Sequence, residues 1–248
     1  MLLRSLFSAL LMYSRIPAPQ VEWKEENRRY ALCFFPLIGA VIGGILTAWR
    51  AVCTAFAIGQ PVFAAVAMLL PLLLTGGIHM DGFLDVTDAR ASCADRAKKL
   101  EILHDPHIGS FAVIWGAALL ILQTALLTQL ADLRTTGVVA VGYVLSRALS
   151  GLTAVLLPAA RHEGSLQSFV KPAHRRITVT ALLLTALAAA AAMIALAPLQ
   201  GTLSTLAAVL VLLYFRHTAL RDFGGVTGDT QGWFLQLCEL AILLPALL

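Results

Sequence analysis

Long apolar segments alternate with short polar connections along this chain, and the pattern predicts a bundle of membrane-spanning helices. A helix needs about 20 apolar residues to cross a hydrocarbon layer of roughly 30 Å. Seven segments approach this length, near 30–57, 61–80, 110–130, 136–157, 177–197, 201–220 and 231–248. We expect the second to end early, at the pair Gly76-Gly77. The predicted fold is an all-α, polytopic integral membrane bundle of about seven helices in a single domain, 1–248.

The beginning of the chain has a different pattern. Residues Met1 to Ile16 mix Leu, Phe and Met with Arg and Ser, and Pro17 and Pro19 follow. This mixture predicts an amphipathic helix that lies on the membrane surface. A cleaved signal peptide is the alternative, but no small-residue cleavage site follows.

Composition supports membrane insertion. Hydrophobic residues make up 59% of the 248 residues, charged residues 13%, and the mean hydropathy is +0.82. A soluble core of this length does not need so much apolar surface. The net charge of +4 could suit nucleic acid, but the basic residues are dispersed without interleaved aromatics, so we expect anionic lipid or a phosphorylated substrate instead. The four cysteines lack CxxC spacing and are expected to be packing residues.

The positive charges predict the orientation of the bundle, because cytoplasmic connections collect Lys and Arg. With the N-terminus inside, the inner segments are 1–29, 81–109, 158–176 and 221–230. Of the 18 Lys and Arg residues, those outside these segments or their edges are Arg50, Arg134 and Arg147. The outer connections are too short to hold a site. The chemistry is therefore expected on the cytoplasmic side, and the oligomeric state, a homo-oligomer included, stays open.

Three carboxylates follow one another where the second apolar segment ends. Asp81, Asp85 and Asp88 have helical spacings of four and seven residues and would share an arc of roughly 60° on one helix face. Like charges repel at such range, so a bound divalent cation would favour the arrangement. Oxygen ligands suit Mg2+, Mn2+ or Ca2+, and a metal at a membrane boundary indicates a phosphate-containing substrate.

Two loops on the same predicted side carry further candidates. Asp105 precedes Pro106, which ends a short amphipathic helix and makes a rigid turn; it and His104 could fold back to the carboxylates or simply be solvated. The second loop, Gly224-Gly225-Val226-Thr227-Gly228-Asp229-Thr230, could cradle phosphate with its backbone N–H groups at the start of the next helix. Asp229 is then a metal ligand or an ordinary helix N-cap.

Two charged residues lie inside predicted spans. A charge inside the bilayer costs free energy, so such a residue usually has a structural or functional role. Arg147 and Glu239 have similar depths in the fourth and seventh spans. Arg147 could reach a pyrophosphate, or the two side chains could pair and hold helices together.

Taken together, these motifs resemble the cobalamin synthase family, the adenosylcobinamide-GDP ribazoletransferases. The resemblance covers nearly the whole chain, and the segments that carry it are Arg15-Ile16-Pro17, Phe35-Pro36-Leu37-Ile38-Gly39, Thr75 to Asp88, Leu100-Glu101-Ile102, Asp105 with Ile108-Gly109, Gly224 to Thr230, and Glu239-Leu240. Departures from the family pattern are Ala89, Pro106-His107 and Gln231, which affect loop geometry rather than the acidic residues or His79.

The resemblance implies a transferase of a bacterial inner membrane that joins adenosylcobinamide-GDP to α-ribazole or its 5′-phosphate and releases GMP. It implies Mg2+ on Asp81, Asp85 and Asp88, with Asp105 as a further ligand or the general base and His79 as the competing base. The resemblance also implies substrate or phosphate binding by a third group of residues, which comprises Arg147, Gly225, Thr227, Gly228, Asp229 and Thr230.

Two other classes of protein share some of these features. A CDP-alcohol phosphotransferase also carries helix-borne aspartates at a membrane edge, but Asp88-Ala89-Arg90 does not supply its signature. A cation-coupled transporter would place polar groups at the bilayer midplane in several broken helices. Here the charges concentrate at one surface, which disfavours transport.

Overall fold

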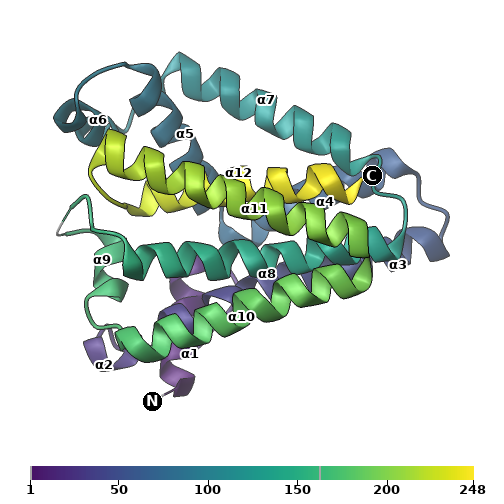
Figure 1. Ribbon diagram of the computed structural model, residues 1–248, viewed down its shortest axis with the longest axis horizontal. Coiled ribbons are helices and arrows are strands. Elements are labelled where there is room, and N and C mark those ends of the chain that lie inside the picture. Colours follow the sequence, from purple (N-terminus) through teal and green to yellow (C-terminus); the bar gives the residue numbers. More distant parts are fainter. Residues whose placement is uncertain (1, 162) are drawn as a thin grey trace.

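The computed structural model describes residues 2–161 and 163–248 and is a bundle of long helices with the short helices gathered mainly at one end (Figure 1). The long helices are α3 (Phe35–Ala55), α4 (Gln60–Thr75), α5 (Ile78–Ala91), α7 (Ser110–Leu127), α8 (Leu133–Leu156), α10 (Arg175–Leu196), α11 (Pro198–Thr218) and α12 (Gly228–Ala246). The remaining elements are α1 (Leu2–Tyr13), α2 (Glu25–Arg28), α6 (Arg96–Ile102), α9 (Ser165–Val170), the 3-10 helix η1 (Ala31–Phe34) and the π-helix η2 (Ala219–Phe223). The described residues contain no strand, only a bridge between Ala159 and Val226.

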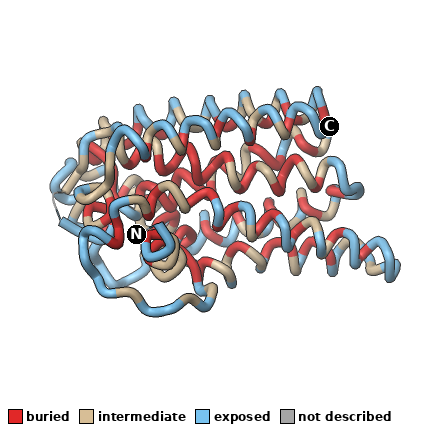
Figure 2. The backbone as a smooth tube through the Cα atoms, turned by 90° about the horizontal axis from the view of Figure 1, so that it is seen from below, coloured by how far each residue is buried: buried red, intermediate tan, exposed pale blue. Residues whose placement is uncertain are grey.

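Helix α8 is the centre of the bundle and packs against α3, α10 and α12. In its most apolar stretch 83% of residues are buried, against 22% in α10 and in α11. Figure 2 shows buried positions inside the bundle and exposed positions along its outer surface. The outer helices expose many large apolar side chains, chiefly Leu, Ile and Val, which is the surface expected against lipid.

Glycines allow α3 to approach α8 closely. A Cβ at Gly39 would collide with the Tyr143 carbonyl, and one at Gly43 with the Ala140 carbonyl. Their spacing of four residues is the small-xxx-small pattern by which membrane helices bring their backbones together. Gly44, on the outer face of α3, has no heavy atom near its Cβ position.

The second predicted span is broken at the expected place. Helix α4 ends at Thr75, α5 begins at Ile78, and the two helices differ in direction by 92°. Gly76 and Gly77 form this bend with φ of 66° and 78°, a left-handed conformation that glycine adopts without steric cost.

Among the described residues, five helices are long and apolar enough to cross a membrane, or six with the α4–α5 pair, where the sequence predicted about seven. The difference is α12, whose 19 residues include Asp229, Gln231, Gln236 and Glu239. Most of α12 is buried, so protein rather than lipid surrounds its polar side chains. The all-α, multi-pass membrane fold is therefore confirmed.

The N-terminal segment forms the expected helix over Leu2–Tyr13, and Met1 lies outside the described residues. Its buried face comprises Ser5, Ser8, Ala9 and Tyr13, and it packs against α2, η1 and α3. Leu2 and Leu3 remain exposed. Helix α1 thus covers the same end of the bundle as α5, α6, α9 and the α11–α12 turn (Figure 1).

We expect Gly43→Ala to lower the free energy of unfolding by about 1–3 kcal/mol, because the new methyl group forces α3 away from the α8 backbone. Gly44→Ala is the matched control on the same helix, and it should be neutral or slightly stabilising. Thermal unfolding in detergent measures both variants. Equal melting temperatures would contradict the close packing of α3 and α8.

Candidate active site

The aspartate motif lies on α5, which crosses the end of the bundle instead of continuing α4. The Asp81 N–H donates to the Gly77 carbonyl at 2.9 Å, so the glycine bend passes directly into the first turn of α5. Arg90, near the end of α5, pairs with Asp222 at 3.1 Å, and Lys99 of α6 pairs with the same carboxylate at 3.3 Å. These ion pairs hold the α5–α6 segment against η2, beside the glycine-rich turn.

Two further glycines bring α5 and α12 together. A Cβ at Gly82 would lie 2.6 Å from the Asp229 carbonyl oxygen, and a Cβ at Gly232 would lie 2.8 Å from the His79 carbonyl oxygen. Any larger side chain would push the two helices apart. The crossing therefore places Asp81 of the first motif next to Asp229 of the second.

The glycine-rich turn is fixed by backbone bonds on both sides. Gly224 has φ of 77°, and Gly225 packs so closely on 158–160 that a Cβ would collide with the Pro158 carbonyl. Val226 donates to the Pro158 carbonyl at 2.9 Å and accepts from Ala160 at 3.1 Å. Gly225 is thus a packing residue of the turn, and its predicted contact with phosphate is not tested.

Helix α12 begins with a capping box. The Thr227 hydroxyl accepts from the Thr230 N–H at 3.1 Å, and the Thr230 hydroxyl accepts from the Thr227 N–H at 2.8 Å. Thr227, not Asp229, is therefore the N-cap, and the Asp229 carboxylate accepts a long bond of 3.4 Å from the Thr227 hydroxyl. The N–H groups of the first turn, at Gly228 and Asp229, are of the kind that a helix leaves without internal acceptors.

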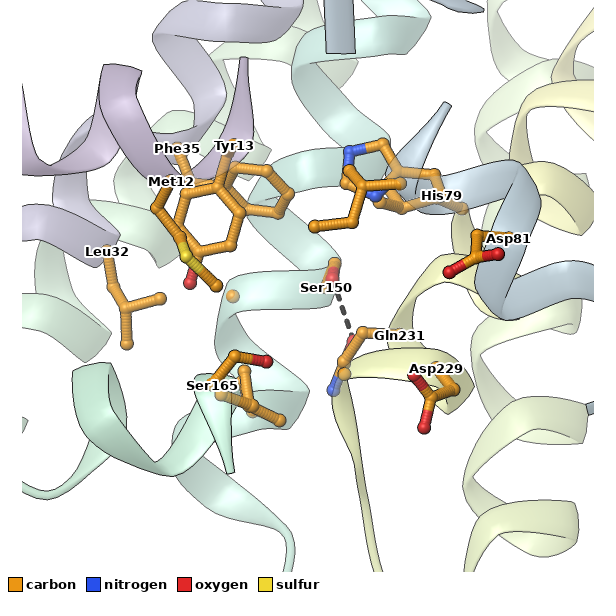
Figure 3. A pocket seen from close by; sticks show the side chains of 16 residues that line it. Met12, Tyr13, Leu32, Phe35, His79, Asp81, Ser150, Ser165, Asp229 and Gln231 are labelled. Carbon is orange, nitrogen blue, oxygen red and sulfur yellow. Dashed lines mark hydrogen bonds between the residues drawn. The ribbon is translucent and has the colours of Figure 1, made fainter. Parts of the chain in front are cut away.

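Both motifs meet in one cavity of about 70 Å³. His79 and Asp81 of α5 lie on one part of its wall, and Gly228 and Asp229 on another. Figure 3 shows Tyr13 and Phe35 at the opposite side of the cavity from the two carboxylates. The remaining wall includes Met12, Leu32, Ser150, Ser165 and Gln231.

Two larger spaces adjoin this cavity. A groove of about 890 Å³ between α1, α4 and α5 shares Asp81 with it, and a pocket of about 520 Å³ shares Asp229. The second pocket is polar and includes His104, Arg161 and Thr227. Arg161 contacts the His104 ring and the Leu100 carbonyl, which joins the 158–161 segment to α6. The candidate site is thus a narrow centre with a large space on either side.

Carboxylates concentrate negative charge at the centre. Asp85, half-buried on α5, is within electrostatic range of Asp81, Asp88 and Asp229. Arg161 is the cation that acts most strongly on Asp229. Within the described residues no three His, Cys, Asp or Glu side chains are close enough to hold a metal by themselves. The arrangement fits a hard cation that shares its ligands with a substrate phosphate, as Mg2+ commonly does.

Asp88 differs from the other two aspartates of α5. Its carboxylate accepts from the Gly109 N–H at 2.6 Å and from the Ala112 N–H at 2.8 Å. Asp88 therefore caps the start of α7. It lines neither the central cavity nor either of the adjoining spaces. Direct metal binding by Asp88 stays a prediction.

The two candidate bases have opposite environments. His79 is buried in the cavity wall with its ring edge-on to Phe35, 5.9 Å between ring centres, and among the described residues its Nε2 has no hydrogen-bond partner. Asp105 lies in an exposed turn and accepts from the N–H and the ring of His107, at 2.9 and 2.7 Å. The backbone bond from His107, followed by the bond from its ring, holds the pKa of Asp105 below its usual range. Geometry favours His79 over Asp105.

Arg147 lies deeper than the cavity. It is fully buried, donates to the Glu239 carboxylate at 2.8 Å and to the Tyr143 carbonyl at 3.1 Å. The structure thus shows the ion pair that the sequence offered as an alternative. Contact between Arg147 and phosphate stays an untested prediction.

Several cavity residues were not predicted from the sequence. Ser150 and Thr153 of α8 both donate to the Gln231 carbonyl, at 2.7 and 3.2 Å, and this buried cluster closes one side of the cavity (Figure 3). Tyr13 of α1 and Ser165 of α9 complete the wall. The signal in the sequence was the row of polar residues on one face of an otherwise apolar α8, which includes Ser146, Ser150 and Thr153.

Comparison with known proteins places this site in a family. The profile described as cobalamin-5-phosphate synthase matches residues 5–248. Curated relatives named adenosylcobinamide-GDP ribazoletransferase include one from Lachnoclostridium phytofermentans, 38% identical over 96% of this chain and 91% of its own length. Others come from Desulfitobacterium hafniense, 33% identical over 98% of this chain and 96% of its own, and Azorhizobium caulinodans, 36% identical over 97% and 94%. No solved structure matches. A match that spans both motifs and nearly every helix shows that the chain belongs to the cobalamin-5-phosphate synthase family.

Proposed function

We propose that this protein transfers the adenosylcobinamide phosphate group of adenosylcobinamide-GDP to α-ribazole or α-ribazole 5′-phosphate, with GMP as the leaving group. The observation that carries the proposal is the shared cavity of Asp81, Gly228 and Asp229, because two motifs far apart in the sequence meet at one centre. The products are adenosylcobalamin or its 5′-phosphate. The family match leaves the CDP-alcohol phosphotransferase and the transporter without support.

The carboxylates around the centre suit Mg2+. We assign Asp81 and Asp229 as its ligands, since both line the shared cavity, and Asp85 adds negative charge beside them. Mg2+ usually takes one or two protein carboxylates and completes its shell with water and substrate phosphates. When bound, it would neutralise charge on the diphosphate and on the departing GMP.

The protein's own groups position the reactants. The N–H groups at the start of α12 bind a phosphate of the substrate. The positive end of the helix dipole adds to the attraction. His79 accepts the proton of the attacking ribose hydroxyl, for which its unpartnered Nε2 is available. The new oxygen–phosphorus bond forms as the bond to GMP breaks, and the closed wall around Ser150 and Gln231 limits attack by water.

The site faces the cytoplasm of a bacterial inner membrane. The connections that carry most Lys and Arg lie at the bundle end that holds the cavity, and cytoplasmic connections collect such charges (Figure 1). Nucleotide substrates are cytoplasmic, so this orientation gives them direct access.

We expect Asp81→Asn and Asp85→Asn to lower kcat about a hundredfold or more, because each removes negative charge that holds the Mg2+ beside the diphosphate. Product formation from adenosylcobinamide-GDP and α-ribazole in detergent measures the effect, and EDTA should abolish wild-type activity until Mg2+ is restored. Asp132→Asn is the control, since Asp132 caps α8 at the far end of the bundle. Full activity in both α5 variants would reject the metal assignment.

Asp88→Asn should act through structure instead. It weakens the cap of α7 and should lower the free energy of unfolding by about 1 kcal/mol. The Mg2+ concentration for half-maximal activity should stay within about twofold of wild type, because Asp88 is not assigned to the metal. A large rise in that concentration with an unchanged melting temperature would instead make Asp88 a ligand.

Cysteine labelling tests the orientation. Cys93 is exposed in the α5–α6 connection, whereas Cys53 and Cys238 are buried and Cys33 is partly covered. A membrane-impermeant maleimide should label Cys93 in inside-out vesicles and not in intact right-side-out vesicles. Labelling from the outer side would place the site on the opposite face.

A further inference from the structure

The groove beside the central cavity has an apolar and a polar end. It lies between α1, α4 and α5, encloses about 890 Å³, and shares Met12, Ile78 and Asp81 with the cavity. Its apolar wall consists of Leu11, Leu72, Leu73, Met80 and Leu84. Its polar end consists of Ser14, Arg15, Thr75 and the bend at 76–77. The polar end adjoins Asp81, so the groove opens toward the proposed reaction centre.

Arg15 is the cation of this groove. Its N–H donates to the Leu74 carbonyl at 2.7 Å, which attaches the chain after α1 to the end of α4. Its side chain crosses Gly76 so closely that a Cβ there would collide with the guanidinium. No carboxylate of the described residues forms an ion pair with Arg15, and its side chain is exposed. A positioned guanidinium without a protein partner is well suited to bind phosphate.

The size of the spaces decides which part of a large substrate each can hold. The central cavity of about 70 Å³ admits only the reacting groups. The corrinoid must therefore lie in an adjoining space, and it is a broad ring with peripheral methyl groups and amide side arms, one of which carries the phosphate. The pocket of about 520 Å³ on the other side is polar and contains His104, Arg161 and Glu163, which suits a nucleotide better.

We propose that the groove between α1, α4 and α5 binds the corrinoid half of adenosylcobinamide-GDP and that Arg15 binds the phosphate attached to it. The macrocycle packs on the leucines of α1 and α4, and its side arm leads past Arg15 to Asp81. Helix α1 is then a wall of the substrate site, and not only a membrane-surface anchor. This assignment rests on the proposed function, because it divides that reaction's substrate between the two spaces.

Steady-state kinetics in detergent test the apolar wall. Leu73→Trp narrows the groove at its exposed edge, and we expect it to raise the KM for adenosylcobinamide-GDP about tenfold with the KM for α-ribazole within about twofold of wild type. Leu69→Trp is the matched control, one turn away on α4, exposed and outside the groove. Leu11→Trp narrows the groove from the α1 side and serves as a second test if the first variant is poorly folded.

Binding of adenosylcobinamide phosphate, which lacks the GMP part, tests Arg15. Arg15→Gln should weaken its binding about tenfold or more in equilibrium dialysis, and Arg15→Lys should restore most of the affinity because the positive charge returns. Size-exclusion profiles check that each variant is folded. Equal binding by wild type and Arg15→Gln would remove Arg15 from the substrate site.

The outcomes separate this inference from the proposed function. If the wild-type protein forms no product with Mg2+ present, the proposed transferase reaction fails. If wild type is active but Leu73→Trp and Leu11→Trp keep the wild-type KM for adenosylcobinamide-GDP, the reaction stands and the groove assignment fails. The second result would mean that the groove holds a bilayer lipid or no part of the substrate.

Discussion

The candidate site depends on the close crossing of α5 and α12. At this crossing Gly82 faces the backbone of Asp229, and Gly232 faces the backbone of His79. The contacted backbones are thus those of Asp229, a proposed metal ligand, and His79, the proposed base. A displacement of either helix would therefore change the distance between Asp81 and Asp229 directly. At these contacts each glycine meets backbone atoms and not a flexible side chain. A shift of one helix therefore has to be followed by the other. Because Gly82 and Gly232 have no side chains, two motifs that are distant in the sequence can form one site.

The rotation of α12 is fixed by polar contacts to α8. Gln231 accepts from Ser150 and Thr153 near the cavity, and Glu239 pairs with Arg147 deeper in the bundle. Breaking a buried pair by removing one partner leaves an uncompensated charge, so alternative rotations of α12 are strongly disfavoured. In lipid such groups would be costly, and their burial between protein helices is what allows a polar helix to occupy the bundle. These contacts orient Asp229 toward the cavity.

The sequence predicted the features that depend on local pattern. Apolar length predicted most of the spans, and Gly76-Gly77 predicted the early end of the second one. The intervals of four and three residues between the aspartates placed them on one helix. It could not predict which carboxylate is already engaged, since Asp88 meets N–H groups from more than 20 residues farther along the chain. Nor could it place Tyr13 or Ser150 in the cavity wall, because their position follows from how α1 and α8 pack. Spacing placed the three aspartates on one helix, whereas the residues that packing brings into the cavity wall could not be predicted.

The position of the site at the end of the bundle follows from the two kinds of surface that meet there. The spans supply apolar walls, such as the leucines of α4, and the connections supply carboxylates, free helix N–H groups and basic side chains. A substrate with a large methyl-bearing ring and a charged diphosphate needs both within a short distance. Apolar and charged surfaces adjoin at the boundary of a membrane domain. Here Asp81 lies at the end of the apolar groove, and Asp229 lies at the edge of the polar pocket. A membrane bundle thus provides this combination without a separate soluble domain.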